Sequence, residues 1–201
     1  MTYVKRLLIA LILLVIGFLG YSFFQARQEL FKVYDVPEQY EYAPKGADVP
    51  VVLFEDFTSD QSRQLHKILK KAVDQDGHII YIPRPVPLND PIKTLLASAI
   101  YAAGEQGKMI EMHDRIYDAW PVYDEQKLID IAKDLGLDTH KFSRDLRSDK
   151  VRAMVNANQS YYEAWAFREL PVLLVDHSYI YLPSGTLPSS EELVTKFEAA
   201  R

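Results

Sequence analysis

The chain contains no cysteine among its 201 residues. This absence excludes disulfide bonds, thiolate catalysis and any metal or haem site held by cysteine. The absence does not by itself locate the protein, because a chain without thiols is tolerated in either redox compartment.

The chain also lacks a cluster of basic residues. Its formal net charge is −5, with 23 basic and 28 acidic side chains. The first 27 residues hold Lys5, Arg6 and Arg27 and no acid, which leaves 20 basic against 28 acidic residues in the remainder. An acidic chain without a basic patch argues against nucleic-acid binding. Hydrophobic residues make up 48% of the chain, enough for the core of one domain and too many for a disordered protein.

One long uncharged run is present, Leu7 to Phe24, directly after Lys5 and Arg6. A bilayer-spanning helix needs about 20 apolar residues, so this run is near the lower limit. A cleaved signal peptide would have an apolar core of about 7–15 residues and a small-x-small cleavage site. The run is longer than that and ends in bulky residues, which favours an uncleaved signal anchor and transmembrane helix within residues 1–27. The basic N-terminal side then stays in the cytoplasm.

Residues 28–48 are interpreted as a juxtamembrane connector, in which Pro37, Pro44 and Gly46 prevent a long helix. The domain proper is assigned to residues 49–201. Apolar runs at 51–54, 77–82, 171–175 and 179–182 predict strands. Between the second and third of these, residues from about 92 to 166 show helical spacing almost throughout. A helix follows the first strand and another, capped by Ser189 or Ser190, closes the chain.

The segment Phe54–His66 reads F-E-D-F-T-S-D-Q-S-R-Q-L-H. It resembles the active-site segment of the DsbA-like thiol-disulfide oxidoreductases, which have the thioredoxin-like fold. Those proteins carry Cys-x-x-Cys where this chain has Ser59-Asp60-Gln61-Ser62. Four further stretches are similar to that family in the same order: Pro87–Pro91, Gly104–Asp114, Leu135–Phe142 and Leu170-Pro171. Agreement of five stretches over residues 46–200 argues strongly for the fold.

The resemblance implies an α/β fold, a thioredoxin-like mixed sheet with an inserted helical domain, preceded here by the transmembrane helix. In that family a cis-proline loop faces the Cys-x-x-Cys segment and grips an extended polypeptide. The corresponding peptide-binding groove of this chain would consist of Ser59, Asp60, Gln61, Ser62, Leu170 and Pro171. The residues before the proline, Glu169-Leu170, depart from the family's usual Gly-Thr or Gly-Val.

Serine at both redox positions removes the family's chemistry. Thiol-disulfide exchange needs a thiolate and a partner sulfur, and serine supplies neither. No catalytic residue is therefore expected at Ser59 or Ser62. The alternative is a DsbA-like oxidoreductase whose active-site cysteines were replaced by serine.

The histidines and serines allow two other chemistries, hydrolysis and metal binding. Ser62 and His66 are spaced i, i+4 and could share a helix face as part of a hydrolase site. A partly exposed helix histidine is the favoured interpretation, with Ser59 as a helix N-cap. No two of the five histidines, His66, His78, His113, His140 and His177, have metal-ligand spacing. The sequence therefore predicts no metal and no cofactor.

The function predicted from these observations is non-covalent. The chain is expected to be a redox-inactive protein of the bacterial inner membrane, with a single span and its domain in the periplasm. It would bind polypeptides, as a scaffold subunit of an envelope assembly or as a chaperone. Its expected partners are proteins of the cell envelope and the membrane itself, through residues 7–24.

Overall fold

The computed structural model describes residues 2–121, 124–176, 179–181, 183 and 186–201. Contacts divide the chain into two compact units, residues 1–35 and residues 36–201. The first unit consists of helix α1 (Thr2–Phe31) and the 3-10 turn η1 (Lys32–Tyr34). Within the described residues, no helix combines the length and the hydropathy that a membrane crossing requires.

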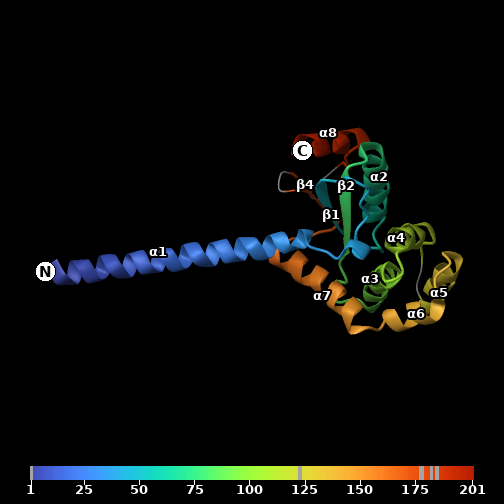
Figure 1. Cartoon of the computed structure of the whole chain (residues 1–201), viewed down its shortest axis with the longest axis horizontal. Coiled ribbons are helices and arrows are strands. Elements are labelled where there is room, and N and C mark those ends of the chain that lie inside the picture. The colour runs from blue at the N-terminus through green and yellow to red at the C-terminus, as the bar shows by residue number, and fades with distance from the viewer. Residues whose placement is uncertain (1, 122–123, 177–178, 182, 184–185) are drawn as a thin grey trace. The chain divides into compact units, whose positions relative to one another are not determined.

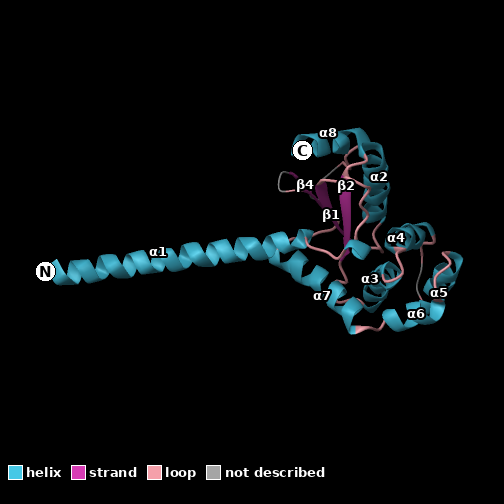
Figure 2. Cartoon of the chain, in the orientation of Figure 1, coloured by secondary structure: helices cyan, strands magenta, loops and turns pink. Residues whose placement is uncertain are grey.

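The second unit is built on a mixed four-stranded sheet in the order β2-β1-β3-β4 (Figures 1 and 2). β1 (Val49–Glu55) pairs in parallel with β2 (Ile79–Pro85). β3 (Val172–Val175) and β4 (Tyr179–Tyr181) add antiparallel pairs. The predicted strands lie within or beside these four, except that Leu182 falls outside the described residues.

Helices α2 (Asp60–Asp76) and α8 (Ser190–Ala200) pack together against the sheet. Leu65, Leu69 and Val73 of α2 are buried because they recur at helical spacing on the side that faces the strands. With Leu193 and Phe197 of α8 they complete one apolar core, called here the sheet core.

Within the described residues, five helices lie between β2 and β3, in the region where the sequence shows helical spacing. Their bounds are α3 Pro91–Gly104, α4 Met109–Asp118, α5 Glu125–Asp134, α6 Thr139–Asp145 and α7 Asp149–Ala164. Four of them begin at an aspartate or serine whose side chain accepts a backbone N–H of the first turn: Asp90, Asp124, Asp138 and Ser148. The inserted helices enclose a second apolar core, called here the helical core.

Part of the segment assigned to the connector packs into this second unit. It contains the 3-10 turn η2 (Glu38–Tyr40), and Tyr40 is fully buried in the helical core. Tyr42 forms an isolated antiparallel bridge with Tyr81 of β2. A Cβ atom at Gly104 would lie 2.8 Å from the Gln39 carbonyl oxygen and from the Tyr40 ring. Glycine at the end of α3 thus lets residues 39 and 40 approach the helix closely.

Candidate functional site

The sheet brings the two halves of the predicted groove to one end. Phe54 near the end of β1 pairs with Val172 at the start of β3. The chain therefore leaves β1 toward Ser59 at the same sheet end at which Pro171 enters β3. The Leu170–Pro171 peptide bond is cis. The site that the resemblance implies thus has the expected backbone frame.

Both serines at the start of α2 form local hydrogen bonds. Ser59 is the N-cap, as predicted, and its hydroxyl accepts from the Ser62 N–H at 3.3 Å. Ser62 is fully buried, and its hydroxyl accepts from the Asp56 N–H at 3.1 Å. The two hydroxyls therefore shape the turn between β1 and α2.

Three of the remaining predicted groove residues, Asp60, Gln61 and Leu170, are more accessible than Ser62. Asp60 is exposed and forms an ion pair with Arg63, one turn along the helix. Gln61 and Leu170 are half-buried, whereas Pro171 is buried. Asp60 and Gln61 are therefore available for contact with a ligand in a way that Ser62 is not.

His66 differs from its prediction, because it is buried rather than partly exposed. Its Nδ1 lies 3.1 Å from the Tyr81 hydroxyl and its Nε2 lies 2.8 Å from Asp114 Oδ1. Among the hydrogen bonds of the described residues, none joins Ser62 to His66. A histidine whose two ring nitrogens are engaged elsewhere is not placed to activate Ser62, so the geometry gives the hydrolase interpretation no general base.

Burial, reinforced by the neighbouring His113, lowers the pKa of His66 below its ordinary value despite the Asp114 hydrogen bond. The neutral ring satisfies both contacts when its Nε2–H donates to Asp114 and its Nδ1 accepts from the Tyr81 hydroxyl. That hydroxyl remains a donor, because burial and the nearby carboxylates raise the pKa of Tyr81 well above its usual value.

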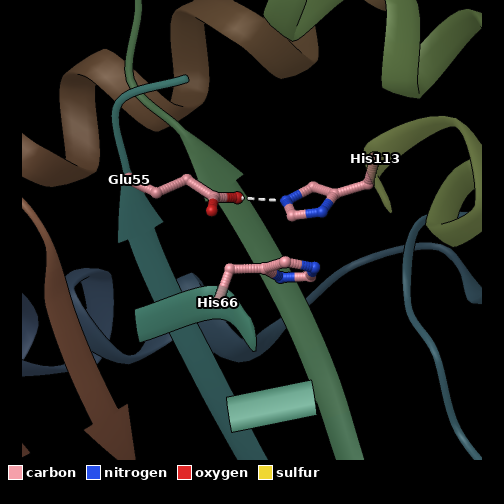
Figure 3. Close-up of side chains that lie close together, drawn as sticks. All are labelled: Glu55, His66 and His113. Carbon is pink, nitrogen blue, oxygen red and sulfur yellow. Dashed lines mark hydrogen bonds and ion pairs between the residues drawn. The ribbon is translucent and has the colours of Figure 1, made fainter. Parts of the chain in front are cut away.

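Glu55, His66 and His113 form a buried cluster, called here the Glu-His-His cluster (Figure 3). Glu55 ends β1, His66 lies on α2 and His113 lies on α4, and none is more than 3% exposed. Glu55 accepts hydrogen bonds from His113 Nε2 at 2.5 Å and from the Tyr117 hydroxyl at 2.8 Å. The two imidazole rings lie 4.2 Å apart between centroids. This arrangement brings together three ionisable side chains from three separate elements.

His113 Nδ1 is buried and has no hydrogen-bond partner within the described part of the chain. Its nearest carboxylate oxygen, Asp114 Oδ1, is 4.0 Å away. A buried polar nitrogen without a partner is uncommon in a folded protein and calls for an explanation.

A surface cavity of about 640 Å³ reaches this cluster, and His66, Asp114 and Tyr117 are part of its lining. Burial raises the pKa of Asp114, but the hydrogen bond from His66 and the nearby charge of Lys70 outweigh burial and leave that pKa below its ordinary value. An ionised carboxylate therefore stands between the cluster and solvent.

Sequence spacing missed this cluster because its members come from three separate elements. His66 and His113 lie on α2 and α4, and only the packing of α4 against the end of the sheet joins them. One ligand-type atom from each of the three residues lies within 4.8 Å of the others, which is compatible with holding a metal ion. The prediction of no metal rested on local spacing alone. His177, the fifth histidine, lies outside the described residues.

A second cavity, of about 470 Å³, borders the cis-proline loop, and Trp165, Phe167, Glu169 and Ile180 contribute to its lining. Phe167 is half-buried: its ring packs edge-on to Phe54 and stacks on Trp165. Ile180 on the edge strand β4 is 49% exposed. An apolar surface therefore adjoins the predicted groove.

The mixed sheet, the helical insertion and the cis-proline beside the start of α2 together define a thioredoxin-like protein of the DsbA type. A family model described as Thioredoxin matches residues 43–194, so the chain belongs to the thioredoxin family. The predicted resemblance is confirmed, with serine in place of both cysteines.

Solved structures share this fold. A thioredoxin-like oxidoreductase from Silicibacter pomeroyi is 24% identical, with a TM-score of 0.66 over 87% of this chain and 94% of that chain. The thiol-disulfide exchange protein alpha-DsbA2 from Wolbachia pipientis is 18% identical, with a TM-score of 0.71 over 88% and 98%. A periplasmic thioredoxin-like protein from Salmonella enterica serovar Typhimurium is 13% identical, with a TM-score of 0.67 over 85% and 95%.

Curated relatives match only in part. The Na(+)/H(+) antiporter NhaA 1 of Salinispora arenicola is 31% identical over 105 residues, which cover 51% of this chain. The matched region spans 16% of that relative's length, so the similarity concerns a minor part of the antiporter.

Proposed function

We propose that this protein binds extended polypeptides without covalent chemistry, at the surface formed by the start of α2 and the cis-proline loop. The observation that carries the proposal is the preserved backbone frame around two serines. β1 and β3 bring Ser59 and Pro171 to one end of the sheet, and both serine hydroxyls are occupied by local hydrogen bonds.

The surroundings of this surface suit a polypeptide ligand. β4 is an edge strand, so its outer side can add an extended segment by main-chain hydrogen bonds. The exposed Ile180 and the cavity beside Phe167 offer apolar contacts for alternate side chains of that segment. The exposed Asp60 and the half-buried Gln61, at the start of α2, add polar groups to this surface.

The proposal also includes attachment to a bacterial inner membrane, with the domain in the periplasm. Support for attachment comes from α1, whose apolar side chains Leu11 to Ile16 are between 48% and 72% exposed. Exposed apolar surface of this extent is typical of a segment that contacts lipid or another protein. Support for the compartment comes from the relative in Salmonella, which is described as periplasmic. Fractionation of cells and carbonate washing of the membranes would test attachment: release of the intact chain into the soluble fraction would contradict it.

The decisive experiment is co-purification of the full chain from native membranes in mild detergent, with wild type, Leu170→Glu and Ala153→Glu compared. Leu170→Glu places a charge in the groove, whereas Ala153→Glu adds the same charge at an exposed position of α7. We expect polypeptides to be retained by wild type and the control and lost from Leu170→Glu.

The identity of what is retained distinguishes a scaffold from a chaperone. One stoichiometric partner would indicate a subunit of an envelope assembly, and many substoichiometric exported chains would indicate a chaperone. Retention that is equal in all three forms would contradict the groove, and retention in none would contradict polypeptide binding. Cysteine codons at 59 and 62 in the native gene would instead identify an oxidoreductase whose cysteines were replaced by serine.

A further inference from the structure

We propose that the Glu-His-His cluster is a binding site for a divalent transition-metal ion of the zinc type, held by Glu55, His66 and His113. This site is separate from the polypeptide-binding surface, and neither proposal depends on the other. The metal-site proposal rests on four observations: the identity of the three side chains, their mutual distances, the unpartnered nitrogen of His113 and the cavity that borders His66.

The three side chains supply the ligand set that zinc uses in proteins. Two imidazole nitrogens and one carboxylate oxygen form a three-residue zinc site that leaves a further position for water. Zinc bonds to nitrogen and oxygen are about 2.0–2.2 Å long, so two ligand atoms on one tetrahedral ion lie about 3.4 Å apart. Ligand atoms that all lie within 4.8 Å of one another can reach these distances by small side-chain rotations.

Binding changes two hydrogen bonds within the cluster. His113 Nε2 and Glu55 Oε1 are 2.5 Å apart, closer than two ligands of the same ion. The proton that Nε2 donates to Glu55 moves to the other ring nitrogen, Nδ1, so that His113 stays a neutral imidazole and the ion takes the place of that proton between Nε2 and Glu55. The separation of the two atoms then grows by about 1 Å toward the ligand spacing of a tetrahedral zinc ion. His66 Nδ1 gives up the hydrogen bond from the Tyr81 hydroxyl, and Glu55 keeps its hydrogen bond from the Tyr117 hydroxyl.

The unpartnered nitrogen of His113 leaves that ring free to make this adjustment. A histidine with a structural role usually has both ring nitrogens hydrogen-bonded, as His66 has here. His113 is held only through Nε2, so no second hydrogen bond opposes a rotation toward an ion. His66 Nε2 is held by Asp114, in the manner of metal ligands whose second nitrogen is fixed by a carboxylate, so Nδ1 is the nitrogen that binds the ion in place of the Tyr81 hydroxyl.

The cluster borders a surface cavity at His66. The cavity of about 640 Å³ is lined by His66 and Asp114, and the side chain of Asp114 is 38% exposed. The three lysines of the lining form ion pairs: Lys70 with Asp74 at 2.7 Å, Lys67 with Asp118 at 3.6 Å and Lys71 with Glu191 at 3.7 Å. An ion that enters the cavity therefore meets the carboxyl group of Asp114 beside His66.

The donor set also selects the class of ion. Mg²⁺ and Ca²⁺ prefer oxygen ligands, six or more in the case of Ca²⁺, and two imidazoles disfavour them. The absence of cysteine removes the thiolates that select Cu(I) or iron–sulfur clusters. Zn²⁺ is the expected ligand, with Ni²⁺ and Cu²⁺ as competitors.

Equilibrium dialysis of the metal-stripped full chain against Zn²⁺, followed by elemental analysis, tests the site. Wild type is expected to retain one ion per chain, and His66→Gln and His113→Gln none. His78→Gln is the matched control, because His78 is exposed beside Asp76 and is not a member of the cluster. At a free zinc concentration of 100 times the Kd, the Tm of wild type should rise by about 5–10 °C. The control variant should show the same rise, and Mg²⁺ at equal concentration should have no effect.

A measurement on unaltered protein covers the case in which the cluster variants fail to fold. Histidine side-chain NMR of wild type is expected to show two of the imidazole spin systems shifting at one equivalent of Zn²⁺, with loss of the Nε2–H signal of His113. Two results would overturn the proposal: no bound zinc in wild type, or zinc binding that His78→Gln removes and His113→Gln leaves intact. Either result would identify the cluster as a purely hydrogen-bonded network.

Discussion

The start of α2 and the Glu-His-His cluster lie close together but differ in the chemical groups that they contain. At the start of α2, Ser59 and Ser62 are committed to backbone hydrogen bonds and carry no ionisable group. In the cluster, a carboxyl group and two imidazoles are buried in contact with one another. The comparison teaches that a chain with serine at positions 59 and 62 still gathers ionisable groups at this end of the sheet, in the buried Glu-His-His cluster.

The largest expected effect comes from placing cysteine at positions 59 and 62. The double substitution Ser59→Cys and Ser62→Cys should convert a chain without thiol-disulfide exchange into one with measurable insulin reductase activity. Thiol 59 would lie at the N-terminus of α2, where the helix dipole and unpaired N–H groups favour a thiolate.

The single variant Ser59→Cys is the control, since it supplies a thiolate without the second sulfur needed to resolve a mixed disulfide. An inert double variant that is folded and fully reduced would show that the frame itself has lost the capacity for exchange.

Replacing one member of the Glu-His-His cluster should lower the free energy of unfolding far more than replacing Ser59 or Ser62. Glu55→Leu removes the acceptor of His113 and Tyr117 and leaves both polar groups buried. Breaking a buried pair in this way costs about 3–5 kcal/mol of unfolding free energy. Urea denaturation followed by circular dichroism measures the change. If Glu55→Leu lowers the free energy of unfolding no more than a substitution at an exposed site does, the cluster contributes little to stability.

Ser62→Ala should have an intermediate effect. The substitution leaves the Asp56 N–H without the hydroxyl that accepts its hydrogen bond at a partly buried position. A buried donor left unsatisfied costs about 1–3 kcal/mol. The same urea titration would detect it, and Ser62→Thr is the control that keeps a hydroxyl. If Ser62→Ala proves neutral, Ser62 is not needed to hold the turn.

Ser59→Gly should have the smallest effect. Replacing an N-cap serine with glycine costs only a few tenths of a kcal/mol, whereas alanine costs about 1 kcal/mol. Ser59→Ala is therefore the matched comparison, and thermal unfolding of both variants measures the difference. Equal destabilisation by the two would indicate that the Ser59 hydroxyl is not the working cap of α2.

The fold could be predicted from the sequence to a large extent because its signals are local. The β-branched run before Thr58, the helix spacing after it and the capping aspartates each act within a few residues, and the structure has an element at each of these places. The groove frame followed from the resemblance, and the structure gives the Leu170–Pro171 bond as cis.

The cluster could not be predicted in this way. Glu55, His66 and His113 meet only because α4 packs beside the end of β1, and no spacing rule encodes that contact. The sequence favours a partly exposed histidine at His66, whereas the structure buries it. The inserted helices cover that side of α2, which is a tertiary effect invisible to local periodicity.

The separation of the apolar interior into a sheet core and a helical core has a consequence for cooperativity. α4 contributes Met112 and Ile116 to the helical core, while α2 contributes Leu65 and Leu69 to the sheet core. The hydrogen bonds of His113 and Tyr117 to Glu55 and of Asp114 to His66 are among the contacts that connect α4 to the strand and helix of the sheet core. These bonds therefore contribute to coupling the opening of the helical core to that of the sheet core. While these hydrogen bonds are intact, amide hydrogens of α2 and α4 should exchange with solvent through one common opening.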